Sequence, residues 1–64
     1  MSLDPFRHVL TDVPLAWEPL QAALATWVRQ QFGPTGIIVR WAVVGTDAET
    51  GGWVVEGVAG PGPA

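Results

Sequence analysis

Hydrophobic residues in the middle of the chain recur with the period of an amphipathic helix. Leu20, Leu24 and Val28 stand four residues apart, and such positions share one face of a helix. Pro19 suits a first helical turn, where its missing N–H costs no hydrogen bond. A Gly-Pro pair then follows, which is typical of a helix end. The pattern predicts an amphipathic helix over about residues 19–32.

Two runs rich in β-branched residues come next, at about residues 37–44 and 53–59. Residues 45–52 between them carry Gly, Asp and Thr, which favour turns, so we predict a β-hairpin. Its register is predicted from charge, with Arg40 directly opposite Glu56, because opposite charges across a strand pair contribute about 0.2–1 kcal/mol.

That register gives the predicted hairpin two different faces. Trp41 and Trp53 share one face, which Trp27 of the helix is expected to cover. Aromatic residues dominate burial in small domains, so we expect a shielded tryptophan cluster, with an aromatic ligand platform as the alternative. The other face is largely apolar and consists of Ile38, Arg40, Ala42, Val44, Val54, Glu56 and Val58.

The first thirteen residues allow two interpretations. Asp4 followed by Pro5 resembles an N-cap and the first position of a helix, which favours a short helix over residues 5–10. A strand over residues 6–10 is the alternative. The chain is therefore predicted to be α+β, with this segment added to the main helix and the hairpin.

Length and composition indicate that the fold needs outside support. Residues 1–59 are expected to form a single small α+β domain, and residues 60–64, all Gly, Pro or Ala, a flexible tail. A chain of 64 residues has a marginal core, and without cysteine no disulfide can support it. Apolar residues make up 48% of the chain and charged ones only 14%, compared with about 25% charged residues in ordinary domains. We therefore expect oligomerisation, with a homodimer as its commonest form.

Two surfaces are candidates for the interface. The back of the predicted helix carries few charges for a solvated face, and the outer hairpin face is mostly apolar. Trp17 lies just before the predicted helix and is a candidate interfacial aromatic, since tryptophan is enriched at binding hot spots. The candidate interface residues are Trp17, Ala22, Arg29, Ile38, Arg40, Val54, Glu56 and Val58.

Charge and hydropathy argue against nucleic acid and membrane as partners. The net charge is −3, and the three arginines are widely spaced, whereas nucleic-acid binding depends on neutralising phosphates. No apolar run approaches the roughly 18 residues that a membrane helix needs. The first residues show no signal-peptide pattern, so we expect a cytoplasmic protein.

Few residues in the sequence could support catalysis. Cysteine, lysine and tyrosine are absent, and the single serine is Ser2. Asp4, His8 and Asp12 recur every four residues and, on a helix, would share one face and offer ligands to a divalent cation. The alternative is a cap, a surface histidine and a turn residue, and we expect neither a metal nor another cofactor.

The sequence therefore favours a non-enzymatic interaction or oligomerisation module, a subunit or regulator of a larger protein. Its expected partner is itself, as a homodimer or a higher oligomer, with another protein as the alternative. One alternative is a metal-binding or enzyme subunit that uses Asp4, His8 and Asp12. Another is a small-ligand binder with a tryptophan-lined pocket between protomers.

Overall fold

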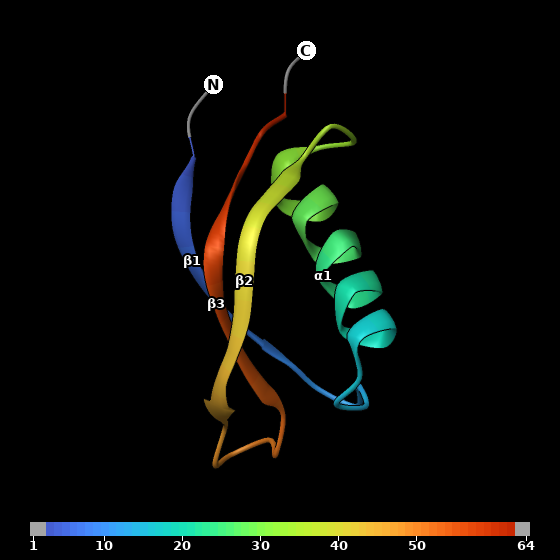
Figure 1. Cartoon of the computed structure of the whole chain (residues 1–64), viewed down its shortest axis with the longest axis vertical. Coiled ribbons are helices and arrows are strands. Elements are labelled where there is room, and N and C mark those ends of the chain that lie inside the picture. The colour runs from blue at the N-terminus through green and yellow to red at the C-terminus, as the bar shows by residue number, and fades with distance from the viewer. Residues whose placement is uncertain (1–2, 63–64) are drawn as a thin grey trace.

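The computed structural model describes residues 3–62, and within them the chain forms one α-helix and one three-stranded antiparallel sheet. In chain order the elements are β1 (Asp4–Leu10), α1 (Trp17–Phe32), β2 (Ile37–Thr46) and β3 (Trp53–Gly60). The strand order in the sheet is β1-β3-β2, and α1 lies along one side of it (Figure 1). The predicted α+β class is confirmed.

The N-terminal segment is a strand, so the favoured prediction of a short helix was wrong and the alternative was right. β1 pairs with β3 along its whole length, from Asp4 opposite Ala59 to Leu10 opposite Trp53. A six-residue helix would be too short to repay the cost of its first turn. Pairing with β3 instead gives the backbone N–H and C=O groups of this segment hydrogen-bond partners on a strand that is distant in sequence.

Helix α1 begins two residues earlier than predicted and ends where predicted. Its N-cap, Ala16, is extended and provides no side-chain hydrogen bond, and Glu18 lies in the first turn, where a negative charge favours the helix dipole. Gly33 ends the helix at φ 91°, and its N–H donates to the carbonyl oxygen of Arg29 at 2.9 Å. This φ is accessible to glycine and rare for other residues.

The β2–β3 hairpin is confirmed, but its predicted register was wrong. Arg40 lies opposite Val58, and Glu56 lies opposite Ala42. The register shifts once between Ile38 and Arg40 and once between Val43 and Gly45, so β2 contains two bulges. A bulge inserts one unpaired residue and moves the pairing by one position. The charge argument failed because Glu56 is paired with Arg7 of β1, in a strand that the two-stranded prediction did not include.

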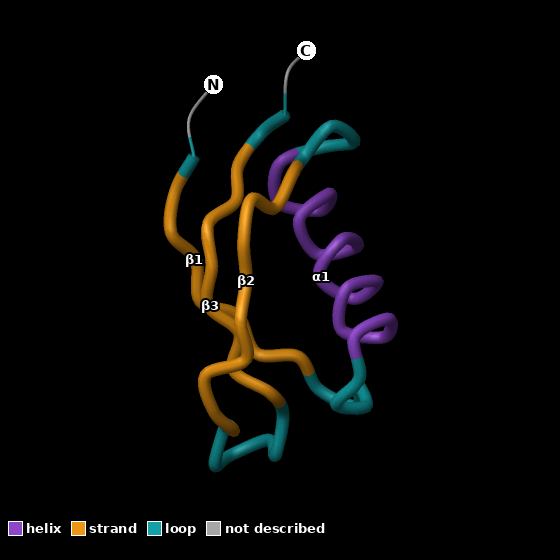
Figure 2. The backbone as a smooth tube through the Cα atoms, viewed as in Figure 1, coloured by secondary structure: helices purple, strands orange, loops and turns teal. Residues whose placement is uncertain are grey.

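The loop between β2 and β3, drawn in teal in Figure 2, has the turn chemistry that its composition predicted. The Asp47 carboxylate accepts hydrogen bonds from the hydroxyl and the backbone N–H of Thr50, at 2.8 and 2.9 Å. These bonds, the hydroxyl bond foremost, lower the pKa of Asp47 because they stabilise the charged form. The Gly51 N–H also donates to the Asp47 carbonyl oxygen at 2.8 Å, and this bond closes the loop.

The core lies between α1 and the inner face of the sheet. Leu20 and Leu24 of α1 form a buried cluster with Leu10 and Val55, and Leu24 and Val55 are completely shielded. Ile38 is packed against this cluster, although it was expected on the outer face. The bulge at residue 39 reverses the alternation on either side of it, which turns Ile38 inward.

The tryptophans do not form the single cluster that the predicted register implied. Trp41 lies opposite Gly57, and Trp53 is four residues away along β3, a separation of about 13 Å. Trp53 donates its indole N–H to the Val13 carbonyl oxygen at 2.7 Å. Trp27 instead covers β1, where its ring stacks on His8 with centroids 4.4 Å apart.

The sheet extends into the segment that was expected to be a tail. Gly60 is the last residue of β3 and is buried. Two residues later, the Gly62 N–H donates to the carbonyl oxygen of Thr35 at 2.8 Å. The remaining residues of the predicted tail, 63 and 64, lie outside the described part of the chain.

Candidate interaction surface

The sheet has a second face that no element of the described chain covers, here called the outer face. Alternation along the strands places on it Pro5, Arg7 and Val9 of β1, Val54, Glu56 and Val58 of β3, and Arg40, Ala42 and Val44 of β2. The open face of an antiparallel sheet normally carries polar residues. Here apolar residues predominate, and one of them, Val44, is 53% exposed.

An open groove of about 670 Å³ crosses this face from β1 to β2. Pro5 and Arg7 line it on one edge, Arg40 on the other, and Glu56 and Val58 on the central strand between them. Because the groove is open and spans all three strands, it suits the surface of another protein better than an enclosed small molecule.

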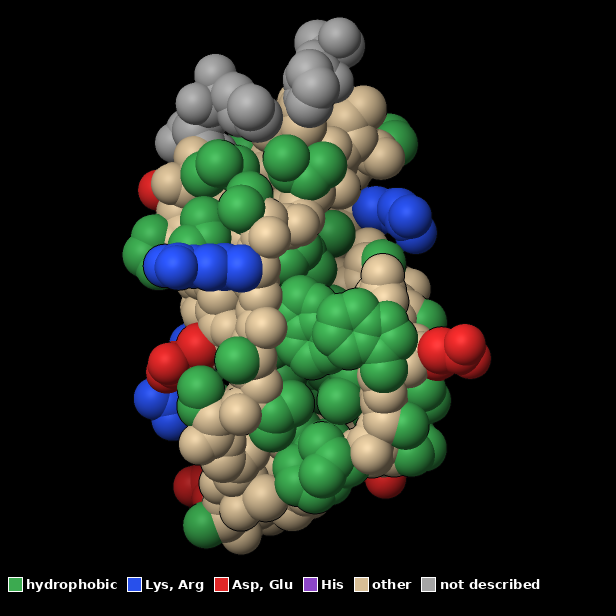
Figure 3. All heavy atoms as spheres, viewed as in Figure 1, with side chains coloured by type: hydrophobic (Ala, Val, Ile, Leu, Met, Phe, Trp, Pro, Cys, Tyr) green, Lys and Arg blue, Asp and Glu red, His purple; other side chains and the backbone are tan. Residues whose placement is uncertain are grey.

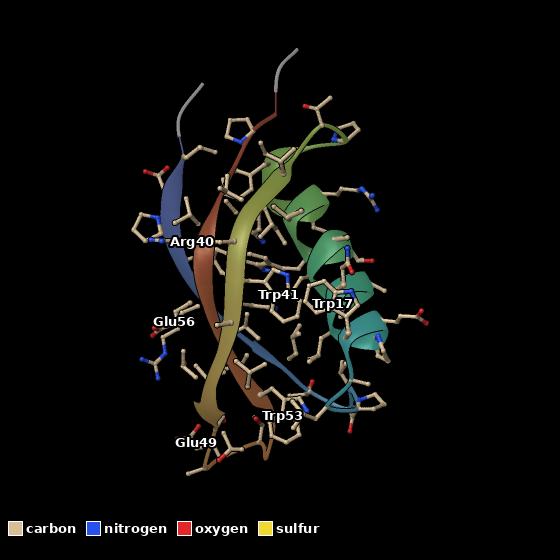
Figure 4. All side chains as sticks on the ribbon, viewed as in Figure 1. Trp17, Arg40, Trp41, Glu49, Trp53 and Glu56 are labelled. Carbon is tan, nitrogen blue, oxygen red and sulfur yellow. The ribbon has the colours of Figure 1, made fainter. Side chains whose placement is uncertain are left out.

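The charges on the outer face are incompletely paired. Arg7 Nη1 lies 3.5 Å from Glu56 Oε2, and both side chains are well exposed, so this pair contributes at most about 1 kcal/mol. Within residues 3–62, Arg40 has no ion-pair partner. Arg40 and Glu56 both point away from α1 (Figure 4), and their register makes them diagonal neighbours.

Both edges of the sheet carry features that hinder pairing with a further strand. β1 contains Pro5, which has no N–H to donate. β2 carries the two bulges, with Val39 and Val44 as the extra residues. Proline and bulges at edges are recognised devices against edge-to-edge association, so the outer face, rather than an edge, is left as the place where another sheet can pack.

A second groove, of about 430 Å³, runs between α1 and β2. Apolar side chains gather along this line on the molecular surface (Figure 3). Trp17 of α1 stacks on Trp41 of β2, with ring centroids 5.1 Å apart and planes inclined by 24° (Figure 4). Trp17 is nevertheless 66% exposed, so one side of this aromatic pair faces solvent.

The candidate interface residues are divided between these two grooves. Arg40, Glu56 and Val58 line the groove on the outer face, and Val54 belongs to the same face but is buried. Trp17, Arg29 and Ile38 line the groove between α1 and β2, as Arg40 also does. Ala22 is exposed on α1 and lines neither.

Sequence reasoning missed Arg7 and Pro5 as residues of these surfaces, and it favoured the core for Trp41. The residues from Pro5 to Leu10 read Pro-Phe-Arg-His-Val-Leu and do not alternate between polar and apolar, so no local pattern marked the first two. Trp41 was expected in the core, with an aromatic ligand platform as the alternative, and this residue of the edge strand β2 lines both grooves.

The structure does not bring the candidate metal ligands together. On a strand, Asp4 and His8 are about 13 Å apart, and Asp12 lies beyond the strand end at φ 59°. Among the described residues, no group of three His, Cys, Asp or Glu side chains is arranged to hold a metal ion. His8 is packed against Trp27 instead, and burial lowers its pKa. Ser2 lies outside the described residues.

Comparison with known proteins leaves the geometry as the basis for a functional argument. No protein family model matches the sequence, and no curated protein or solved structure matches it. Residues 3–62 include no helix with the length and apolar character needed to cross a membrane.

Proposed function

We propose that this protein is a non-enzymatic interaction module that associates with a second copy of itself through the outer face of its sheet. The observation that carries the proposal is the apolar composition of a sheet face that nothing in the described chain covers. Exposed apolar area of this kind marks an interaction site in small proteins. The charges of both signs on the face, Arg40 and Glu56, suit a self-complementary contact.

The dimensions of the face predict a weak dimer. Three strands about 4.8 Å apart and seven residues of about 3.3 Å each make a surface of roughly 14 Å by 23 Å. The area of this face, roughly 320 Å² from these dimensions, is small compared with the roughly 800 Å² per partner of a standard stable interface. We therefore expect a dissociation constant in the micromolar range, and a dimer that forms and separates rapidly.

Sedimentation velocity over a range of protein concentrations tests the proposal. The wild type should shift from monomer to dimer, and Val58→Asp should remain a folded monomer because it places a carboxylate in the contact. Ala22→Glu is the matched control, since it adds the same charge on α1 outside both grooves. Circular dichroism checks that each variant is folded.

Two results would contradict the proposed dimer. A wild type that remains monomeric at high micromolar concentration would remove self-association altogether. Dissociation by Ala22→Glu, with none by Val58→Asp, would transfer the interface to the back of α1.

A second candidate function, small-ligand binding, rests on the exposed Trp17–Trp41 pair in the groove between α1 and β2. Its volume is within the range of small-molecule sites, and a flat aromatic ligand could stack on the free side of Trp17. This groove lies within one chain, whereas the sequence suggested a pocket between protomers.

Titration with 2-naphthoate as a probe, followed by NMR of the indole N–H signals, tests this candidate. Binding should move the signals of Trp17 and Trp41 and leave that of Trp53 unchanged, because Trp53 does not line this groove and its N–H is bonded to Val13. Trp17→Ala should abolish the shift at Trp41. Equal small shifts at all four tryptophans would show nonspecific contact and contradict the site.

A further inference from the structure

Arg40 is the charged residue of the outer face that the described chain leaves without an opposite charge. It is exposed, lies on the edge strand β2, and has no ion-pair partner within residues 3–62. Its side chain points over the outer face, on the same side of the sheet as Glu56 (Figure 4). An arginine carries five N–H donors in a fixed fork that matches a carboxylate.

Glu56 has the opposite arrangement, with acceptor capacity to spare. It lies on the central strand, and one carboxylate oxygen contacts Arg7 at 3.5 Å, which is long for a charged hydrogen bond. Its side chain is 47% exposed, so solvent water can reach the rest of the carboxylate. When another surface covers the central strand, that water is lost and the charge needs a second donor.

Two-fold symmetry offers Arg40 of a second copy as that donor. If the axis runs parallel to the strands, the β2 strand of one copy lies across β1 of the other. Arg40 then faces the row formed by Pro5 and Val58, one diagonal step from Glu56. Packed sheets are about 10 Å apart, a gap that arginine and glutamate side chains can span together, and the symmetry makes each pair twice.

Resting on the proposed self-association, we infer that two reciprocal ion pairs, each between Arg40 of one copy and Glu56 of the other, set the register and selectivity of the dimer. The same axis places the two Glu56 side chains opposite each other on the central strands, and each carboxylate has both its own Arg7 and the incoming Arg40 to offset that like-charge contact. The apolar residues around them provide most of the contact area, and the ion pairs exclude registers that would leave Glu56 covered without a partner.

Charge reversal in separate chains tests this inference. Arg40→Glu alone and Glu56→Arg alone should each weaken self-association at least about tenfold, because each homodimer then contains two like-charge contacts. An equimolar mixture of the two variants should form a heterodimer of near wild-type affinity, since both opposite-charge contacts are restored. Arg29→Glu is the matched control, with the same charge change on α1, and should leave the dimer intact.

Native mass spectrometry identifies the heterodimer, and sedimentation velocity measures its affinity. The milder variants Arg40→Gln and Glu56→Gln provide a second test that does not depend on the reversed chains folding. Raising sodium chloride from about 0.05 to about 0.5 M should weaken the wild-type dimer more than the Arg40→Gln dimer, because screening acts on charge pairs.

The possible results separate this inference from the proposed function. A wild-type dimer that both single reversals leave unchanged would overturn the ion pairs and leave self-association standing. Failure of the mixed variants to pair, when each alone has lost its dimer, would also overturn them. A wild type that is monomeric at high micromolar concentration would overturn the proposed function itself.

Discussion

The two faces of the sheet are built from the same three strands and have opposite environments. On the inner face, Val55 is completely shielded beneath Leu24 and Leu20 of α1. On the outer face, Val44 is 53% exposed and Arg40 has no opposite charge within the described residues. The inner face is completed by the chain itself, whereas the outer face has a comparable apolar character without a cover. Fold stability and association are therefore expected to depend on different faces.

Truncation of a large apolar residue should produce the largest difference between the two faces. Leu24→Ala on α1 should lower the free energy of unfolding by about 2–5 kcal/mol, because it leaves a cavity in a fully buried site. Val44→Ala on the outer side should change it by less than about 0.5 kcal/mol. Urea unfolding at one protein concentration, low enough to keep the chains monomeric, measures both. Similar losses for the two variants would mean that the faces do not differ in this way.

Two glycines allow the same comparison with a smaller expected effect. A Cβ on Gly57 would overlap the carbonyl oxygen of Arg40, which the bulge in β2 brings over this residue. Gly57→Ala should therefore cost about 1–3 kcal/mol, since backbone atoms have to move. A Cβ on Gly45, also in the hairpin, would meet no atom within 4 Å, so Gly45→Ala should be nearly neutral. Urea unfolding again measures both, and a neutral Gly57→Ala would show that the bulge readily shifts.

The smallest expected effect is a pH dependence that arises on the inner face. Burial against Trp27 lowers the pKa of His8 below its usual value of 6.5, so the unfolded chain binds a proton more readily than the folded one. Stability from this group is fully present above about pH 6.5 and declines as the pH falls below it. Urea midpoints between about pH 5 and pH 8 should show this decline in the wild type and lose it in His8→Gln. An unchanged slope in the variant would assign the decline to another group.

Local sequence signals determined the elements that are close along the chain. The four-residue spacing of Leu20, Leu24 and Val28 and the Gly33 stop identified α1 almost to the residue, because helix formation depends on side chains within one or two turns. The β-branched runs and the Gly- and Asp-containing loop identified the hairpin for the same reason. Arg40, Glu56 and Val58 were also named correctly as residues on one face of the sheet.

Only the tertiary structure decided the rest. β1 is a strand because β3, more than forty residues away, provides its hydrogen-bonding partner, and no local pattern outweighs that pairing. The pairing of β1 with β3 places Arg7 beside Glu56, where Arg40 had been predicted. Arg40 is left without an ion-pair partner within the described chain. The bulges at residues 39 and 44 then set which side chains of β2 face inward. Register and bulges arise from the sum of many contacts between distant strands, which a pattern read along one strand does not contain.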